Sequence, residues 1–364
     1  MKYKLSDICE YAKEKIKISA LDENTYISTE NMLPNKSGIT QAASIPTQEQ
    51  TQAFVKNDVL VSNIRPYFKK IWYATFDGGC SNDVLVFRAK GGINSQFLHY
   101  ALADDSFFNY AMSTSRGTKM PRGDKKAIME YEVPKFSYED QNKVVNILKS
   151  LDDKIELNNK INKNLEQQAK TLYKEYFATV DSEMHNIKAL DTFCYIFTGK
   201  KNSNASTQDG KFKFFTCSPE PLQIDSFIFD GNAIIVSGNG AYTGRTRFYS
   251  GKFDLYQRTY ACVLKESFNP DYIFPLYWFV KLELSKKIMG GTRGSAIPYI
   301  VMNDLAKFAF EFNPNKFESY IPLFKSITEA IQANENQNEA LAQLRDVLLP
   351  RLMSGELDVS NIDI

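Results

Sequence analysis

The sequence predicts an α+β protein with two similar mixed α/β modules, which two long helices hold apart as an antiparallel coiled coil around a pseudo-twofold axis. Three observations predict this class: an internal repeat through the whole chain, short strand-like segments in each repeat, and a heptad period at the end of each repeat. With 364 residues, the chain is also longer than a single hydrophobic core usually supports.

The repeat consists of matched segments in the same order in both halves. Four pairs match: LSDIC (5–9) with LDTFC (190–194), VKNDVLVSN (55–63) with DGNAIIVSG (230–238), SNDVLVF (81–87) with RTYACVL (258–264), and RGTKMP (116–121) with RGSAIP (293–298). The second pair is separated by 230 − 55 = 175 residues, and the last two pairs by 177. Four accidents in one order are not credible, and the apolar alternation of the middle pairs predicts a buried strand in each half.

A short strand and then a helix are predicted after each Arg-Gly loop. The strand candidates are MEYEVPKF (129–136) and KFAFEFNP (307–314), after which apolar residues recur at alternating steps of three and four, as in a coiled coil. The predicted core positions are Leu148, Leu151, Ile155, Asn158, Asn162, Leu165 and Leu172 in the first helix, and Ile327, Ile331, Asn334, Asn338, Leu341, Leu348 and Leu352 in the second.

The Asn residues at equivalent core positions predict that the two helices pair with each other, because a buried amide needs a hydrogen-bond partner. Separate packing of each helix against its own module is the alternative. The predicted domains are a first module at 1–140, a helix at 141–180, a second module at 181–320, a helix at 321–354 and a tail at 355–364.

Composition excludes several classes of protein. The 44 basic and 43 acidic residues give a net charge of +1, which excludes a uniformly basic protein but allows basic patches. The five cysteines form no Cys-x-x-Cys pair, and the N-terminus has no apolar stretch typical of a signal peptide. No run of about 18 apolar residues predicts a membrane span. We therefore expect a reduced, cytoplasmic protein that does not contact a membrane.

Motifs for catalysis are incomplete in this sequence. GNGAYTGRT (238–246) has Arg245 where a phosphate-binding loop needs Lys, and Asp271 and Glu283 are followed by Ser285 where a metal nuclease needs Lys. Asn313-Pro314-Asn315 departs from the Asn-Pro-Pro-aromatic methyltransferase motif, and the chain has only two histidines. We expect neither catalysis nor a metal site in this chain.

Basic residues gather in corresponding loops of the two halves. Beside Gly, Ser, Thr and Tyr, such residues suit contacts with DNA phosphates, and Arg can read guanine in the major groove. The predicted DNA-binding residues are Arg65, Lys69, Lys70, Arg116, Thr118, Lys119, Arg122 and Lys125 in the first module, and Arg245, Arg247, Lys286, Lys287, Arg293 and Ser295 in the second. Solvated surface charge is the alternative, although the duplicated placement favours DNA contact.

The chain resembles the specificity subunits of type I restriction-modification systems. LLPRLMSGELDVS (348–360) resembles the C-terminal signature of that family, and residues 141–177 resemble its first conserved helix. The order of segments also resembles the family's: target-recognition domain, helix, target-recognition domain, helix. Two stretches depart from the family pattern, because FSYEDQ (136–141) and NPNKFESYI (313–321) stand where a Pro-Pro-x-x-Glu-Gln run is usual.

The resemblance implies a non-catalytic subunit that reads a bipartite double-stranded DNA target. Each module would read one half-site and the helices would set the unread gap between them; because the loops differ, we expect an asymmetric target. The implied partners are two methyltransferase subunits and, where the system has them, restriction subunits. The chain itself would hold no cofactor, since S-adenosylmethionine belongs to the methyltransferase partner and ATP and magnesium to the restriction partner.

Three other interpretations compete with this one. A coiled-coil scaffold could bind protein through its modules without reading DNA. A stand-alone nuclease with two DNA-binding halves would need the carboxylate and Lys set that the sequence lacks. A methylation-only system would use the same kind of subunit without a nuclease partner.

Overall fold

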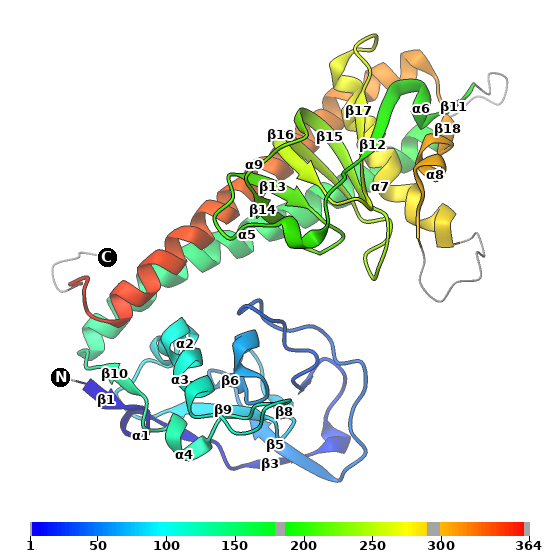
Figure 1. The fold of residues 1–364 in the computed structure, drawn as a ribbon. Coiled ribbons are helices and arrows are strands. Elements are labelled where there is room, and N and C mark those ends of the chain that lie inside the picture. The colour runs from blue at the N-terminus through cyan, green and yellow to red at the C-terminus, as the bar shows by residue number, and fades with distance from the viewer. Residues whose placement is uncertain (1, 179–185, 290–298, 360–364) are drawn as a thin grey trace. The chain divides into compact units, whose positions relative to one another are not determined.

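The structure, a computed structural model, describes residues 2–178, 186–289 and 299–359 (Figure 1). The chain forms two compact units, residues 1–155 with 339–364 and residues 156–338. Each unit contains one module together with one stretch of each long helix.

The first module has three small sheets and four short helices. Its elements are β1 (Lys2–Lys4), α1 (Leu5–Ile8), β2 (Cys9–Tyr11), β3 (Lys15–Lys17), β4 (Tyr26–Ile27), β5 (Gln50–Phe54), β6 (Val59–Ser62), β7 (Ile71–Tyr73), β8 (Gly78–Cys80), β9 (Val84–Ala89), α2 (Ser95–Ala103), α3 (Asp105–Ser113), α4 (Lys125–Ile128) and β10 (Glu132–Pro134). The sheets have the strand orders β2-β9-β6-β7, β3-β5-β8-β4 and β1-β10.

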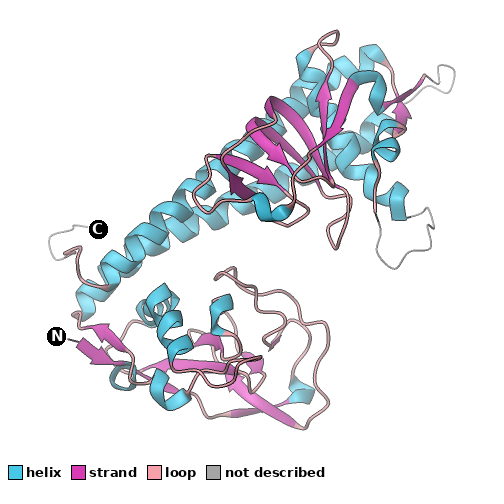
Figure 2. Ribbon diagram, viewed as in Figure 1, coloured by secondary structure: helices cyan, strands magenta, loops and turns pink. Residues whose placement is uncertain are grey.

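The central sheet of this module is buried on both faces. Val59 and Phe87 pack in one core with Phe97 of α2, whereas Leu60 and Val86 pack in another with residues of the β3-β5-β8-β4 sheet. Successive side chains of a strand point to opposite faces, so the continuous apolar run at 59–61 supplies both cores. Figure 2 shows the helices beside the strands of this module.

The second module repeats this plan with one larger sheet. Its elements are β11 (Ile187–Ala189), α6 (Leu190–Phe193), β12 (Cys194–Thr198), β13 (Phe212–Phe215), β14 (Leu222–Ile224), β15 (Phe229–Ser237), β16 (Thr246–Leu255), β17 (Thr259–Leu264), α7 (Ile273–Met289), α8 (Met302–Ala306) and β18 (Ala309–Glu311). The large sheet has the order β12-β17-β15-β16-β13-β14, and β11 pairs with β18.

The two modules share their strand topology. The order β12-β17-β15-β16 repeats β2-β9-β6-β7, and the β11-β18 pair repeats β1-β10. Phe87 pairs with Tyr11 and Val59, while Cys262 pairs with Ile196 and Ile234. The structural repeat of these strands is therefore 262 − 87 = 175 residues, two fewer than the sequence match, and a shift of two keeps each side chain on its face. The α+β class and the similarity of the modules are confirmed.

The two long helices are α5 (Tyr138–Ala178) and α9 (Pro314–Met353). The Ser137 hydroxyl oxygen accepts from the N–H of Asp140 at 3.1 Å, and the Asn313 side chain accepts from the N–H of Lys316 at 3.2 Å, so both starts are capped. Helix α9 begins seven residues before the predicted 321, because Asn313 caps it and Pro314 suits the first helical position. None of the described helices is apolar over enough length to cross a membrane.

In the second unit, the helices pair antiparallel through amide groups. The Asn158 Nδ2 group donates to Asn338 Oδ1 at 2.8 Å, and the Asn334 Nδ2 group donates to Asn162 Oδ1 at 2.7 Å. The buried Asn158 amide also donates to Gln337 at 2.8 Å. Of the predicted core positions here, Ile327 and Ile331 are buried and Leu165 and Leu172 half-buried.

In the first unit, the start of α5 meets the end of α9, which again gives an antiparallel pairing. Leu148 and Leu352 are buried in one core, and Leu151, Ile155, Leu341 and Leu348 are half-buried. The Arg345 Nη1 group donates to Asp152 Oδ1 at 2.9 Å. The heptad pattern therefore places its core positions between the helices in both units.

His99 of α2 gives this unit a predicted dependence on pH. Its ring lies 5.7 Å from that of Tyr73 and 5.4 Å from that of Tyr100, between ring centroids, and Nδ1 is buried without a hydrogen-bond partner among the described residues. Burial lowers the pKa of His99 to about 4; the charges of Arg345 and Lys36 act in the same direction and Asp152 opposes them.

A depressed histidine pKa makes the folded state disfavour protonation. The stability that this preference contributes is complete above the unfolded pKa of about 6.5 and is lost as pH falls from there to about 4. We expect His99→Gln to reduce the loss of unfolding free energy between pH 7 and pH 4 by about 2 kcal/mol, measured by urea unfolding of the full chain. A constant difference between wild type and variant over that range would contradict the prediction.

Candidate nucleic-acid interface

The predicted cations of the first module lie on two loops beyond one end of the central sheet. The first loop, residues 63–70, joins β6 to β7, and the 3-10 turn Pro66–Phe68 lies within it. Arg65 and Lys69 flank this turn with left-handed backbone, φ 49° and φ 50°. Non-glycine residues in this region are strained, and such strain is concentrated at functional sites.

A segment unique to the first module supports this loop. The N–H of Asn35 donates to the carbonyl of Phe68 at 2.8 Å, and the N–H of Lys36 donates to that of Lys69 at 2.9 Å. Both donors lie in the stretch 32–53 that has no clear counterpart in the second half of the sequence. Tertiary contacts therefore hold the loop in its strained conformation.

The second loop is the RGTKMP segment, which folds back as a small hairpin. Arg116 and Arg122 close it by two backbone hydrogen bonds, of 2.9 and 3.0 Å. Gly117 has φ 94°, a left-handed conformation that glycine adopts without steric cost. Thr118 and Lys119 are exposed at its tip, and Lys125 is exposed at the first position of α4.

Backbone pairing joins the two loops. Ile64 pairs with Arg122, and the N–H of Arg65 donates to the carbonyl of Pro121 at 2.8 Å. The structure thus brings together predicted residues from segments about 50 positions apart: Arg65, Lys69, Lys70, Arg116, Thr118, Lys119 and Arg122.

Acidic residues orient most of these cations. Arg116 lies 3.1 Å from Asp124 and Arg122 lies 3.1 Å from Asp83, yet their side chains remain 86% and 57% exposed. Lys69 contacts Asp105 at 2.7 Å. The N–H groups of Ala127 and Lys126 lower the pKa of Asp124, which keeps it ionised. Exposed pairs of this kind contribute little to stability but restrict where the cation points.

The second module has an equivalent loop between β15 and β16. It spans residues 238–245, the same length as 63–70, and the bond from the N–H of Ser237 to the carbonyl of Arg245 repeats that from Ser62 to Lys70, at 3.0 Å in both. Asn239 pairs with Tyr299 as Ile64 pairs with Arg122. The chain that follows the second Arg-Gly loop therefore meets the sheet where the first one does.

The predicted cations of the second module have different surroundings. The Arg245 guanidinium lies 4.3 Å above the ring of Tyr242, which holds it at the loop surface. Arg247 is half-buried in β16; burial lowers its pKa, and the charge of Arg245 does the same. Lys286 lies on α7 and contacts Glu283 at 2.7 Å. Arg293, Ser295 and the side chain of Lys287 lie outside the described residues.

Sequence reasoning missed three exposed residues on these loops. Tyr67 and Tyr242 occupy equivalent positions, 242 − 67 = 175, and are 48% and 39% exposed. Arg258, just before β17, is also exposed. Extending the 175-residue match past Ser62 would have aligned the tyrosines, whereas Arg258 was visible only as part of a strand match.

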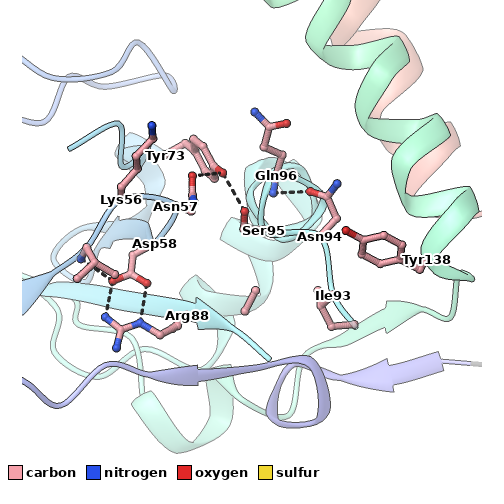
Figure 3. Close-up of a pocket in the computed structure, with 12 residues that line it drawn as sticks. Lys56, Asn57, Asp58, Tyr73, Arg88, Ile93, Asn94, Ser95, Gln96 and Tyr138 are labelled. Atoms are coloured by element: carbon pink, nitrogen blue, oxygen red, sulfur yellow. Dashed lines mark hydrogen bonds and ion pairs between the residues drawn. The ribbon is translucent and has the colours of Figure 1, made fainter. Parts of the chain in front are cut away.

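A hollow of about 490 Å³ lies at the other end of β6, lined by Lys56, Asn57, Asp58, Tyr73 and Arg88 among others (Figure 3). Its buried carboxylate, Asp58, is paired with Arg88, so the charges satisfy each other. No group of three or more potential metal-ligating side chains lies together in the described ranges. The loops at the opposite end of the strand are the better candidate for binding.

Comparison with known proteins gives consistent relatives. Residues 1–167 match the family described as the type I restriction modification DNA specificity domain. The chain is 32% identical over 168 residues to the EcoDI specificity subunit of Escherichia coli, covering 44% of this chain and 36% of that protein. It is 24% identical over 313 residues to the MjaIX specificity subunit of Methanocaldococcus jannaschii, covering 75% of this chain and 71% of that protein.

The fold has a counterpart among solved structures. The S subunit of the type I restriction-modification system from M. genitalium superimposes with a TM-score of 0.57 at 14% identity, covering 97% of this chain and 96% of that one. At this identity the likeness concerns the fold alone. The match to the E. coli relative spans just over a third of that protein's length.

Proposed function

Because residues 1–167 belong to the type I restriction-modification DNA specificity domain family and the chain is related to type I specificity subunits over most of its length, we propose that it reads a bipartite, asymmetric DNA target for partner subunits. Each module reads one half-site through its sheet-end loops. The partners act on the DNA by adenine methylation and, where a restriction subunit is present, by cleavage.

The observation that carries this proposal is the duplicated loop framework. The loops 63–70 and 238–245 have the same length and the same closing hydrogen bond, and each presents a tyrosine and a following cation, Lys70 or Arg245. Cations beside aromatic and small polar residues suit phosphate and base contacts. A framework that occurs twice with different side chains fits two half-sites of different sequence.

The long helices offer surface for protein partners. In the second unit, Leu157 and Ile161 are 50% and 39% exposed one turn apart on α5, and in the first unit Leu344 and Val347 are 47% and 58% exposed on α9. Paired exposed apolar residues on a helix are typical of contact sites. We propose that two methyltransferase subunits dock on these helices.

Chemistry resides in the partners under this proposal. The methyltransferase subunits carry S-adenosylmethionine, and restriction subunits carry ATP and magnesium. This chain contributes DNA contacts and the spacing between them, which makes it a non-catalytic subunit.

Base-resolution mapping of methylated adenines tests the function. The full chain is co-expressed with the methyltransferase subunits encoded beside it, and the complex is first shown to assemble. We expect one bipartite motif with a fixed gap and two different half-sites. Identical half-sites would refute the asymmetry, and an assembled complex that methylates nothing would refute the DNA-reading role. DNA binding that does not depend on salt would favour the protein-binding scaffold instead.

A further inference from the structure

We infer that one pair of equivalent positions determines the base preference of each half-site: Asp83 and Arg122 in the first module, and Arg258 and Tyr299 in the second. This inference rests on the proposed function. It assigns Arg122 and Arg258 as base-contacting residues and Asp83 as the residue that positions Arg122.

Backbone hydrogen bonds establish that the positions are equivalent. The N–H of Asn63 donates to the carbonyl of Asp83 at 2.8 Å, and the N–H of Gly238 donates to that of Arg258 at 2.9 Å. Both steps follow the strand repeat, since 238 − 63 and 258 − 83 are each 175. Position 83 in one module is therefore position 258 in the other.

The second position of the pair is anchored in the same way. Arg122 pairs with Ile64 and Tyr299 pairs with Asn239, and the next residues bond to the strand end. The N–H of Gly123 donates to the carbonyl of Asn63 at 3.3 Å, and that of Ile300 to the carbonyl of Gly238 at 2.8 Å. Each module thus holds both positions against the residue that follows its strand, β6 or β15.

The side chains at these positions differ in chemistry. In the first module the Arg122 Nη2 atom lies 3.1 Å from Asp83 Oδ1, and both side chains are substantially exposed, 57% and 39%. In the second module an arginine replaces the acid: Arg258 is exposed, and its guanidinium has no hydrogen bond or ion pair with any described side chain. A tyrosine, 40% exposed, replaces Arg122.

This difference predicts different readout from one framework. A guanidinium held by a carboxylate has its direction restricted, while its remaining N–H groups can donate to two acceptors on guanine. Arg258 lacks such a holder and projects from the strand side of the framework instead of the hairpin side. Equivalent backbones therefore aim their arginines from different points, so the two half-sites place their preferred base at different positions.

The test compares single variants in the assembled methyltransferase complex by mapping methylated adenines. We expect Arg122→Ala to reduce discrimination at one base pair of one half-site by about tenfold or more, and Arg258→Ala to do so in the other half-site only. Lys56→Ala and Lys252→Ala are matched controls, because both are exposed cations near the opposite ends of the same sheets.

Conservative variants separate base reading from charge and from folding. Arg122→Lys keeps the charge but loses the bidentate donors, so we expect it to retain most of the affinity and salt dependence but to lose the base preference. Asp83→Asn should weaken the same preference without moving the other half-site. Urea midpoints of each variant control for folding.

The outcomes are distinct. Loss of affinity that is uniform over all sequences would overturn the inference and leave these arginines as phosphate contacts. An unchanged motif in well-folded variants would also overturn it. Both results leave the proposed function intact, because the wild-type motif would stand. A wild-type complex without a bipartite motif would overturn both.

Discussion

Replacing Arg116, Lys119 and Arg122 together by Ala is expected to weaken binding of the assembled complex to its target by about 100-fold or more. The three side chains lie on the hairpin at residues 116–122, and all are exposed. If they contact DNA, their loss removes up to three phosphate or base contacts at once. Each lost phosphate contact should also lower the magnitude of the slope of log affinity against log salt by about 0.9.

The measurement is a salt titration of target binding by the complex with wild-type or triple-variant chain. A matched control, Lys2→Ala with Lys4→Ala and Lys56→Ala, removes the same charge from exposed positions outside both loops. An equal loss of affinity in the two triple variants would show that only net charge matters, and would contradict a specific role for the hairpin.

Replacing Arg88 by Met is expected to destabilise the first unit by about 3–5 kcal/mol, because it leaves a buried carboxylate without its partner. The Asp58 side chain is only 2% exposed. Arg88 donates to both of its oxygens, from Nε at 2.9 Å and from Nη2 at 2.8 Å, as Figure 3 shows. The hydrogen bond and charge of Asp58 raise the pKa of Arg88, so the pair stays ionised at any pH at which the protein folds.

Urea unfolding of the full chain, followed through the transition of this unit, measures the effect. The double variant Asp58→Asn with Arg88→Met is the control, since Asn keeps an acceptor for the N–H of Val55, which donates to Asp58 Oδ2 at 2.9 Å. We expect the double variant to recover part of the lost stability. A loss below about 1 kcal/mol for Arg88→Met, or no recovery, would contradict the assignment of a buried ion pair.

The candidate interface was predicted in part. The sequence placed cations in the right loops, because turn residues after an apolar strand mark a loop locally. It did not place Tyr67 or Arg258, since nothing local distinguishes an exposed loop tyrosine from a packed one. It also grouped Arg247 with the exposed cations, whereas the structure half-buries it in β16.

By itself the sequence determined the repeat, the α+β class, the two long helices and their Asn positions. These features follow from periodicity and matched segments, and periodicity reflects backbone geometry that is set within a few residues. The pairing of Asn158 with Asn338 followed because a buried amide must find an acceptor and a donor.

Only the tertiary structure decided which loops meet and which acids hold which arginines. Asp83 and Arg122 are 39 residues apart in the sequence, and their contact depends on how the hairpin packs against the end of β6. The support of Lys69 by residue 36 and the strand register of 175 likewise depend on hydrogen bonds between distant segments. Such contacts arise from the packing of whole elements, for which a local pattern holds no information.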